Sequence, residues 1–387
     1  MRICYFTPVF LPDVGGAEYV TDALARTLTQ QGHHVHVLTR GRPVDLDLPY
    51  PVTWYRKTHF PHHRPERVLN HLRRLHRREA FDVFLVNYGR PTGIAAVRLT
   101  ARTGVPTVLV SHGGDLYEHS EDRRRPRLFR RTVEAYATAD AAIAISPHIE
   151  QLIREIRPAS LPLARIPNGV DPDALHAPAH RPEDLPFTDQ PFLLALGNLT
   201  EYKGFDDAID AFALAQPQLS NTHLAIVGQG KMLPILQQKI HQHRLAPRVH
   251  LLGQRTGNDK RWLMQHCRFG LMPSLEEGHP IVGLEFMALH KPVVCSLNPA
   301  FNQMFVDGQN AFRVPAQNPD ALAQAIINMH RSDLDAMGHA GLPRLAQFEW
   351  PAIAQRYAQV MQDAIAHRRK TTGPSTIPTT PPPSRNA

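Results

Sequence analysis

Short apolar runs alternate with amphipathic stretches through the N-terminal part of the chain. Residues 18–31 place apolar side chains at helical spacing, and Gly32 follows them as a helix-ending residue. Buried strands that are separated by helices of this length predict a parallel, doubly wound sheet. The runs that predict these strands are 2–8, 34–40, 81–88, 106–112 and 141–146.

The same alternation begins again after residue 190. Helices are predicted at 205–215 and 283–290 because apolar residues recur there at helical spacing. Two successive units of this kind predict an α/β protein whose ligand lies in a cleft facing the carboxyl ends of the strands. The predicted strands of this second unit are 192–198, 222–230, 248–254, 269–274 and 292–296.

The composition of the connecting segments indicates where the domains begin and end. We expect Rossmann-like domains at 1–172 and 191–350, joined by a linker at 173–190 that is rich in Pro, Asp and His and has no clear periodicity. A helix is predicted at 351–368. The Pro/Thr-rich end of the chain, 369–387, is expected to be disordered.

Length, charge and cysteine content add limits to this architecture. The chain has 387 residues, which suits two domains, and a formal charge of +8, which favours anionic partners without choosing among them. The N-terminal apolar run is broken by prolines, so we expect no signal peptide, and no run approaches the ~20 apolar residues of a membrane span. Cys4, Cys267 and Cys295 lack CxxC spacing and lie in apolar segments, which indicates buried thiols and a cytoplasmic protein.

Residues 273–294, PSLEEGHPIVGLEFMALHKPVV, carry the most informative chemistry. A strand ends there, a glycine-containing loop follows, and a helix is predicted to begin near Ile281 or Val282. A helix N-terminus presents unpaired backbone N–H groups and a positive dipole end, which together bind a diphosphate. Gly278 allows the backbone to come close to a ligand.

Two glutamates flank this loop and helix start. Glu277 can accept hydrogen bonds from the hydroxyls of a sugar, and Glu285 can accept them from the hydroxyls of a ribose. The alternative is a helix with ordinary acidic residues near its N-terminus, which the helix dipole favours in any case. Two glutamates eight residues apart do not by themselves distinguish a ligand-binding segment from an ordinary helix start. The flanking PS, GxP and KPVV patterns add support for the ligand-binding interpretation.

With those flanks, the segment resembles the E-x7-E signature of the large retaining glycosyltransferase family 4, whose fold is the two-domain GT-B fold. Further stretches resemble that family in the expected order, so the resemblance covers about residues 1 to 367. These stretches are GGAE (15–18), HGGD (112–115), AD…IAIS (139–146), IPNGVD (166–171), LGNLTEYKG (196–204), AIVGQG (225–230), HLLGQ (250–254) and DGQNAF (307–312).

The resemblance implies roles for residues of the N-terminal domain, which is the acceptor side. Gly15 and Gly16 would let the backbone approach the donor's phosphate or sugar, although glycine is also common in plain strand-to-helix turns. His112 would contact the donor sugar near the reacting carbon, either by donating a hydrogen bond or by orienting the sugar. Asp115 would cap the next helix or orient neighbouring groups.

In the C-terminal domain the resemblance implies the rest of the donor site. Lys203 would neutralise the phosphates of the departing nucleotide. Asn198 stands where the family usually has Arg and can offer only a neutral amide hydrogen bond. Gly228 and Gln254 would lie near the nucleobase, with tight turns as an equal explanation for the glycine loops.

Two further positions depart from the family pattern. His279 stands beside the sugar, where an aromatic or aliphatic residue is more usual, and it either alters sugar choice or simply packs. Gln303 replaces a frequent Glu, and no consequence is assigned to this change.

The reaction implied by the resemblance is transfer of a hexosyl unit from a nucleotide-sugar donor to a glycan or lipid-linked acceptor, in cell-surface polysaccharide or glycolipid synthesis. Retention of the anomeric configuration is expected, with His112, Lys203 and Glu277 as catalytic residues. No metal ligand and no cofactor beyond the donor are expected, because Asp173 in DPD lies in the linker and not at a strand end.

Several other functions compete with this reaction. A nucleotide-sugar epimerase and a non-catalytic nucleotide-sugar or membrane-surface binding protein are compatible with the fold. A phosphorylase would need a pyridoxal lysine and a much longer chain. An RNA-binding protein would bind RNA tightly and with strong dependence on salt.

Two basic stretches, 62–79 and 122–131, suggest an anionic partner for the N-terminal domain. The first predicts an amphipathic basic helix, which suits the inner face of an anionic membrane, and a solvated helix face is at least as good an explanation. Nucleic-acid binding would favour aromatic residues among the basic ones, and the first stretch has none. We therefore expect no nucleic-acid partner.

Overall fold

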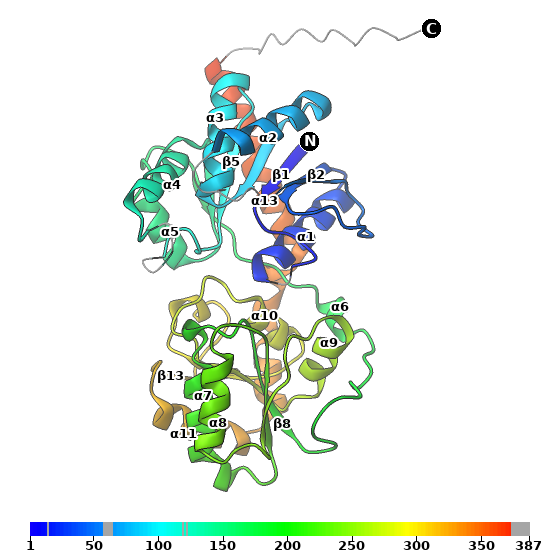
Figure 1. Cartoon of the computed structure of the whole chain (residues 1–387), viewed down its shortest axis with the longest axis vertical. Coiled ribbons are helices and arrows are strands. Elements are labelled where there is room, and N and C mark those ends of the chain that lie inside the picture. The colour runs from blue at the N-terminus through cyan, green and yellow to red at the C-terminus, as the bar shows by residue number, and fades with distance from the viewer. Residues whose placement is uncertain (14, 57–64, 118–119, 121–122, 373–387) are drawn as a thin grey trace.

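The chain forms two lobes, each built on a parallel sheet, as the apolar pattern predicts (Figure 1). The predicted tail at 373–387 and residues 62–64 and 122 of the basic stretches lie outside the part of the chain that can be described. The computed structural model describes residues 1–13, 15–56, 65–117, 120 and 123–372.

The first lobe contains, within the described residues, seven parallel strands in the order β3-β2-β1-β4-β5-β6-β7. The order reverses between β1 and β4, so the loops after these two strands diverge and leave a crevice at their carboxyl ends. The strands are β1 Arg2–Thr7, β2 His34–Arg40, β3 Val52–Tyr55, β4 Val83–Asn87, β5 Thr107–Ser111, β6 Ala141–Ala144 and β7 Leu163–Arg165. The helices are α1 Gly16–Gln30, α2 Pro65–Glu79, α3 Ile94–Thr103, α4 Pro126–Thr138 and α5 Pro147–Arg154.

The second lobe repeats this arrangement with, among the described residues, six parallel strands in the order β10-β9-β8-β11-β12-β13. Its order reverses between β8 and β11, which places a second crevice beside those two strands. The strands are β8 Phe192–Leu196, β9 His223–Val227, β10 Val249–Leu251, β11 Gly270–Met272, β12 Val293–Ser296 and β13 Ala311–Val314. The helices are α7 Phe205–Ala215, α8 Leu233–Gln242, α9 Gly257–His266, α10 Ile281–Ala288, α11 Pro319–Arg331 and α12 Leu334–Ala340.

Three strands are absent from the sequence-based prediction for a common reason. Strands β3, β7 and β13 are the outermost strands of their sheets, and most of their side chains are partly exposed. Only part of such a strand faces the core, which weakens its apolar pattern. The fourth edge strand, β10, is also partly exposed and was nevertheless predicted. The central strands β4 and β5 are buried along their whole length and were predicted from that pattern.

The segment between the sheets contains a helix that its composition does not predict. Helix α6 spans Pro172–His176, and the Asp171 side chain caps it by accepting a hydrogen bond from Ala174 N at 3.1 Å. Gln265 of α9 donates to the carbonyls of Leu175 and Ala177, so the segment is tied to the second lobe.

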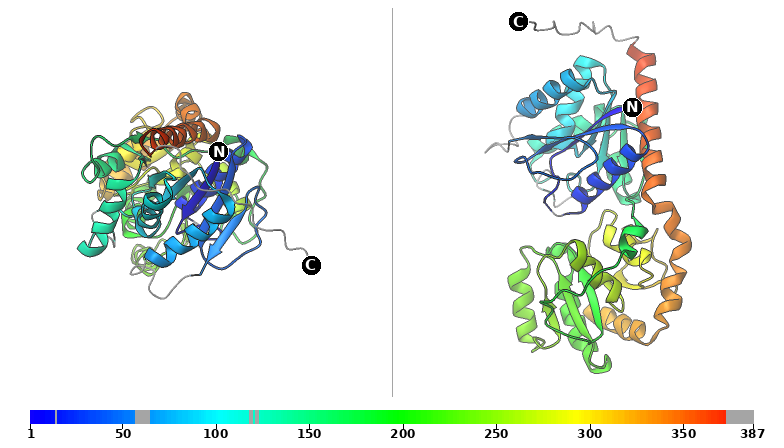
Figure 2. Two further views of the ribbon diagram at one scale, coloured as in Figure 1. Left: turned by 90° about the horizontal axis from the view of Figure 1, so that it is seen from above. Right: turned by 90° about the vertical axis from the view of Figure 1, so that its right-hand side faces the viewer.

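The last helix returns to the first lobe. Helix α13 spans Trp350–Thr372 and runs along the N-terminal lobe in both side views (Figures 1 and 2). Its side chains Trp350, Ile353, Tyr357 and Met361 are buried in the core of that lobe. Residues 369–372 continue this helix, so the predicted end of the helix at residue 368 was wrong.

The apolar side of the basic helix α2 faces the protein core. Val68, Leu69, Leu72 and Leu75 are all buried, which accounts for the amphipathic pattern without any membrane contact. Among the described residues, no helix has the length and apolar character needed to cross a membrane.

The three cysteines are buried and free, as their apolar surroundings predict. Burial raises the pKa of the Cys267 thiol to about 12 and that of the Cys295 thiol to about 12. Thiols in this state are poor nucleophiles at neutral pH.

Candidate active site

A cavity of about 520 Å³ lies between the two lobes, where the loops after β1, β8 and β11 meet. These loops belong to the two points at which the strand order reverses, so the fold brings them together. Gln303 is not part of the lining. All the site residues predicted from the sequence line the cavity: Gly15, Gly16, His112, Asn198, Lys203, Gly228, Gln254, Glu277, Gly278, His279, Ile281, Val282 and Glu285.

Glu277 and Lys203 form an ion pair that joins the loops after β11 and β8. Lys203 Nζ lies 2.6 Å from Glu277 Oε1, and Ser274 Oγ donates to the same oxygen at 2.8 Å. The backbone N–H of Leu275 also donates to the carbonyl of Tyr202, at 2.8 Å. The sequence placed the carboxylate and the cation in one site but did not predict that they contact each other.

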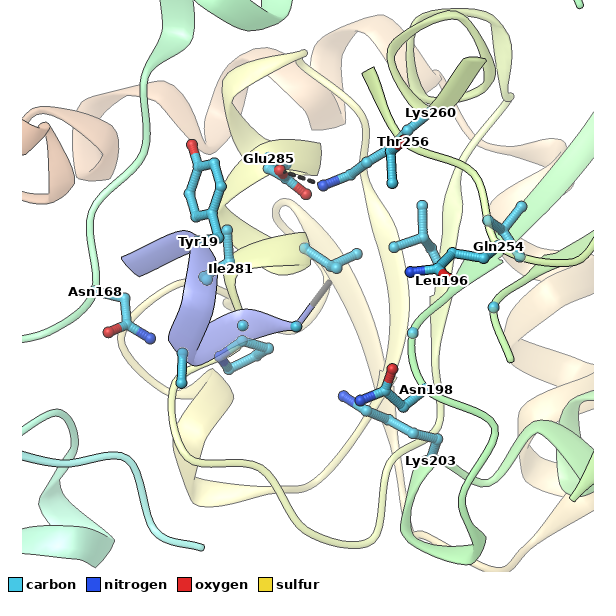
Figure 3. Close-up of a pocket in the computed structure, with 18 of the residues that line it drawn as sticks. Tyr19, Asn168, Leu196, Asn198, Lys203, Gln254, Thr256, Lys260, Ile281 and Glu285 are labelled. Atoms are coloured by element: carbon cyan, nitrogen blue, oxygen red, sulfur yellow. Dashed lines mark hydrogen bonds and ion pairs between the residues drawn. The ribbon is translucent and has the colours of Figure 1, made fainter. Parts of the chain in front are cut away.

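Glu285 lies on α10, which begins at Ile281 as predicted. Its carboxylate is buried, and Oε1 accepts a hydrogen bond from Lys260 Nζ at 2.6 Å (Figure 3). Its other oxygen, Oε2, is buried and has no hydrogen-bond partner within the described residues. One carboxylate oxygen is therefore held in place, while the second is buried and has its hydrogen-bonding capacity unused among the described residues.

No pattern in the sequence indicates Lys260 as a site residue. It lies on α9, 25 residues before Glu285, and belongs to none of the family stretches quoted above. A lone lysine on a short helix carries no distinctive pattern, so only the folded structure identifies it as a partner of Glu285.

Gly278 occupies a point where the two lobes approach each other closely. A Cβ atom added there would lie 3.1 Å from the carbonyl oxygen of His112 and 3.1 Å from Tyr117 Oη. A side chain would therefore push the loop of the second lobe away from the first.

Gly228 is required by the packing of two loops in the second lobe. Its φ is +152°, and an added Cβ would lie 1.9 Å from the carbonyl oxygen of Gly197. This contact explains the glycine without a ligand, and its position near a nucleobase stays a prediction.

His112 follows β5 and is half-buried at the cavity wall. Its Nε2 lies 3.2 Å from Asn87 Oδ1. Burial lowers the pKa of His112 to about 4, so the imidazole is neutral at pH 7. The predicted projection of this side chain towards the cleft is confirmed.

Asp115 orients groups around the His112 loop and does not cap a helix. Its carboxylate accepts hydrogen bonds from Gly89 N at 2.6 Å and from Tyr136 Oη at 3.1 Å. Among the described residues the next helix, α4, begins at Pro126, so the geometry favours the orienting role over the capping role.

His279 lines the cavity with little of its side chain exposed. It is 4% exposed, its ring lies 5.5 Å from the ring of Phe348, and neither ring nitrogen has a hydrogen-bond partner among the described residues. Burial lowers the pKa of His279 to about 3. Of the two alternatives stated for this residue, the geometry favours packing.

Asn198 is exposed, and its side chain lies beside that of Lys203 at one end of the cavity (Figure 3). A further cation of the lining, Arg255, is paired with Asp184 at 2.5 Å and with Asp259 at 3.1 Å. The guanidinium of Arg255 is thus already engaged by two carboxylates. Further lining residues that the sequence did not indicate are Leu11, Asp13, Tyr19, Asp22, Asn168 and Thr256.

Comparisons with known proteins identify both halves of the chain. The model for Glycosyltransferase Family 4 matches residues 14–174, and the model for Glycosyl transferases group 1 matches residues 177–337. A phosphatidyl-myo-inositol mannosyltransferase of Mycobacterium leprae is 25% identical over 385 residues, which cover 94% of this chain and 96% of the relative.

Solved structures share the fold along nearly the whole chain. Sucrose-phosphate synthase from Thermosynechococcus elongatus superimposes with a TM-score of 0.80 at 21% identity, covering 95% of this chain and 100% of that one. The HepE protein of Anabaena, in complex with UDP-glucose, gives a TM-score of 0.74 at 20% identity, covering 94% and 100%.

The chain folds into two parallel, doubly wound lobes, and a cavity lies where the strand order of each lobe reverses. This architecture defines the protein as one of the GT-B class of α/β proteins. The two matching models add the family. The chain belongs to glycosyltransferase family 4 and is therefore a glycosyltransferase.

Proposed function

We propose that the protein transfers a hexosyl unit from a nucleotide-sugar donor to a glycan or lipid-linked acceptor, with retention of the anomeric configuration. The observation that carries this proposal is the arrangement of Glu285, Lys203 and Glu277 around one cavity, with an unpartnered oxygen of Glu285 buried among the described residues.

Glu285 would bind the ribose of the donor. Lys260 holds Oε1, and the unpartnered Oε2 would accept a ribose hydroxyl after a rotation of the carboxylate that exposes it. The N-terminus of α10 lies in the same wall, and its first N–H groups and dipole favour the neighbouring diphosphate.

Lys203 would stabilise the charge that develops on the leaving nucleotide. The lysine is held 2.6 Å from Glu277 at the cavity wall, and its remaining N–H groups can donate to a diphosphate beside that carboxylate. We propose that this cation and the helix N-terminus supply the stabilisation that a metal ion supplies in other enzymes.

Glu277 would hold the sugar as it acquires positive charge at the reacting carbon. One carboxylate oxygen already accepts from Lys203 and Ser274, so the other oxygen is left for sugar hydroxyls. Retention by attack from the same face as the departing nucleotide is the route that the family resemblance implies.

The acceptor would enter from the side of the first lobe. Asp13, Tyr19 and Asp22 line this side of the cavity and supply polar atoms. The name of the mycobacterial relative supports a lipid-linked acceptor, and we infer a role in polysaccharide or glycolipid synthesis on that basis.

Incubation with UDP-, GDP- and ADP-sugars, with and without EDTA, tests this proposal. We expect one class of donor to be hydrolysed slowly without acceptor, in the presence of EDTA, and the sugar to be released with its original anomeric configuration by NMR. Inversion at the anomeric carbon would contradict retention, and loss of turnover with EDTA would contradict metal independence.

The same incubation separates the competing functions. Conversion of the donor into a second nucleotide sugar would identify an epimerase. Binding without hydrolysis or transfer, for every donor and for glycan and lipid acceptors, would identify a non-catalytic binding protein.

A further inference from the structure

Four buried residues of β1, α1 and β4 form a hydrogen-bond network beside His112: Tyr5, Thr7, Thr21 and Asn87. We propose that Asn87 is a positioning residue that holds His112 in the Nε2–H form, so that the imidazole presents an unprotonated Nδ1 to the cavity and accepts a hydrogen bond from a hydroxyl of the transferred sugar. The part of this inference that concerns the sugar rests on the proposed function, and the part that concerns the imidazole does not.

The network begins with two threonine hydroxyls. Thr21 Oγ1 donates to the carbonyl of Ala17 at 2.7 Å, and Thr7 Oγ1 donates to the carbonyl of Val9 at 2.9 Å. A hydroxyl has a single proton, so neither oxygen can donate a second hydrogen bond. Towards any other neighbour, each of these oxygens can only accept.

Asn87 donates a hydrogen bond to each of the two threonine hydroxyls. Its Nδ2 lies 2.9 Å from Thr21 Oγ1 and 3.3 Å from Thr7 Oγ1. The opposite orientation of the amide would set its oxygen against two hydroxyls whose protons are engaged with backbone carbonyls, so each threonine would have to give up its present hydrogen bond. Because Asn87, Thr7 and Thr21 are fully buried, that arrangement would leave buried polar atoms unsatisfied.

The orientation of the amide decides the protonation of His112. Asn87 Oδ1 accepts from Tyr5 Oη at 3.3 Å and faces His112 Nε2 at 3.2 Å. An amide oxygen can only accept, so Nε2 must carry a proton. A neutral imidazole has one N–H, and the proton on Nε2 therefore leaves Nδ1 as an acceptor.

The charge state of His112 agrees with this assignment. Burial alone lowers its pKa to about 4, so the imidazole is neutral at pH 7 and carries one proton, which the contact with Asn87 assigns to Nε2. No hydrogen bond to Nδ1 is made by the described residues, and this atom is not among the buried polar atoms that lack a partner. It is therefore open to the cavity that His112 lines.

A neutral acceptor suits the proposed chemistry better than a donor. The sugar acquires positive charge as the nucleotide leaves, and an imidazolium beside it would oppose that charge. A lone pair from Nδ1 orients a sugar hydroxyl without adding positive charge. Of the two expectations stated for His112, orientation of the sugar is favoured over donation to it.

A structural role for Asn87 is the alternative, because its side chain also ties β1 and α1 to β4. The variant Asn87→Asp separates the two roles. It keeps an oxygen opposite His112 Nε2 but adds a negative charge, which favours the imidazolium and raises the pKa of His112 by roughly 1–3 units. The titratable groups nearest to this imidazole are Tyr88, whose ring centroid lies 5.6 Å away, and Tyr5, which shares Asn87 Oδ1 with it; from the second lobe, Lys203 and Glu277 line the same cavity.

Nitrogen-15 NMR of the ligand-free protein tests the assignment without any substrate. We expect wild-type His112 to show the Nε2–H form from pH 8 to about pH 5, and Asn87→Asp to protonate Nδ1 at a pH roughly 1–3 units higher. Protonation of wild-type His112 on Nδ1, or identical titration of the two proteins, would overturn the role of Asn87.

Kinetics then test the contact with the sugar. For Asn87→Asp, kcat/KM for transfer should fall on the acid side at a pH where the wild type is unaffected, and should recover as the pH rises. The control Thr100→Val removes a buried hydroxyl pair with Thr107 (2.7 Å) away from this network and should keep the wild-type pH profile. If Asn87→Asp shows an altered NMR titration of His112 but a wild-type pH profile of kcat/KM, the contact between His112 and the sugar is wrong. A lack of turnover in every protein would instead contradict the proposed function.

Discussion

The polar residues of the cavity share one arrangement at the residue scale. Glu277, Glu285 and His112 each have one side-chain atom held by a neighbouring residue. Each of them also has a second polar atom for which no partner is recorded among the described residues. Such an arrangement orients a side chain before the ligand arrives, which reduces the entropy lost on binding.

Replacing Lys203 should affect turnover more than donor binding. Lys203→Met removes the cation that would meet the charge of the departing nucleotide, and kcat should fall by about 10²–10³-fold, as for other preorganised charge-stabilising groups. The exposed Lys231, which does not line the cavity, provides the control Lys231→Met with unchanged kcat. A kcat within twofold of wild type for Lys203→Met would remove Lys203 from the mechanism.

Replacing His279 by an apolar ring should stabilise the protein. At pH 7, His279→Phe removes two buried ring nitrogens without partners and should raise the free energy of unfolding by about 1–2 kcal/mol. Denaturation in urea measures this change. Destabilisation with loss of donor binding would instead show that the imidazole serves the sugar.

The stabilisation by His279→Phe should grow as the pH falls. The pKa of His279 is about 3 in the folded protein, against an ordinary value of 6.5, so between these values the unfolded chain binds a proton that the folded chain does not. The free energy of unfolding of the wild type therefore decreases as the pH falls below 6.5. His279 alone accounts for a decrease of about 2 kcal/mol by pH 5. The phenylalanine variant should lack this part of the loss.

Residue types and their order along the chain were enough to predict many of the residues that line the cavity. The glycines, Lys203 and the two glutamates stand in motifs that follow strands, and a strand's carboxyl end is where a doubly wound fold binds its ligand. Lys260 and Asn87 could not be found in this way. Their roles depend on a partner 25 residues away in each case, and no local pattern identifies that partner.

At the scale of elements, the strand-order reversals explain why the site forms between β8 and β11. Loops diverge there and leave the N-terminus of α10 facing the cavity. Elements that are buried on both faces could be predicted from their apolar runs. The edge strands β3, β7 and β13 could not, because their side chains are partly exposed.

The burial of the apolar face of helix α2 leaves only its charged face for contact with a membrane. Its apolar side chains are buried in the first lobe, so a contact of the kind suggested by the sequence would depend on exposed arginines such as Arg74, Arg77 and Arg78. We predict that changing these three to Gln weakens binding to phosphatidylserine vesicles by about 10²-fold, at roughly 1 kcal/mol for each charge. Sedimentation with vesicles measures this, and binding that survives high salt would contradict an electrostatic contact.

At the scale of the whole molecule, the chain crosses between the lobes twice. It passes to the second lobe through α6 and returns through α13, whose apolar side completes the core of the first lobe (Figure 2). Helical spacing predicted that α13 exists. It could not predict which lobe the helix covers, because that depends on contacts with residues more than 300 positions earlier, such as Gln31, which donates to the carbonyl of Pro351.

Stability of the first lobe should therefore depend on α13. Tyr357 is 1% exposed, and Tyr357→Ala should lower the free energy of unfolding by about 3–5 kcal/mol, the cost of removing a buried aromatic side chain. The hydroxyl of Tyr357 has no partner among the described residues, so the matched control Tyr357→Phe should cost nothing. Equal stability of the alanine variant and wild type would show that α13 does not contribute to this core.

Calorimetric titration with UDP, GDP and ADP tests the central claim, that this cavity binds a nucleotide-sugar donor through Glu285. We predict that one of the three nucleotides binds to the wild type. The control Glu349→Ala, which changes an exposed residue, should bind this nucleotide with the same Kd. Glu285→Ala should bind it at least about tenfold more weakly, which is a loss of roughly 1.4 kcal/mol or more of binding free energy. Failure of all three nucleotides to bind, or equal affinity of the wild type and Glu285→Ala, would contradict the account.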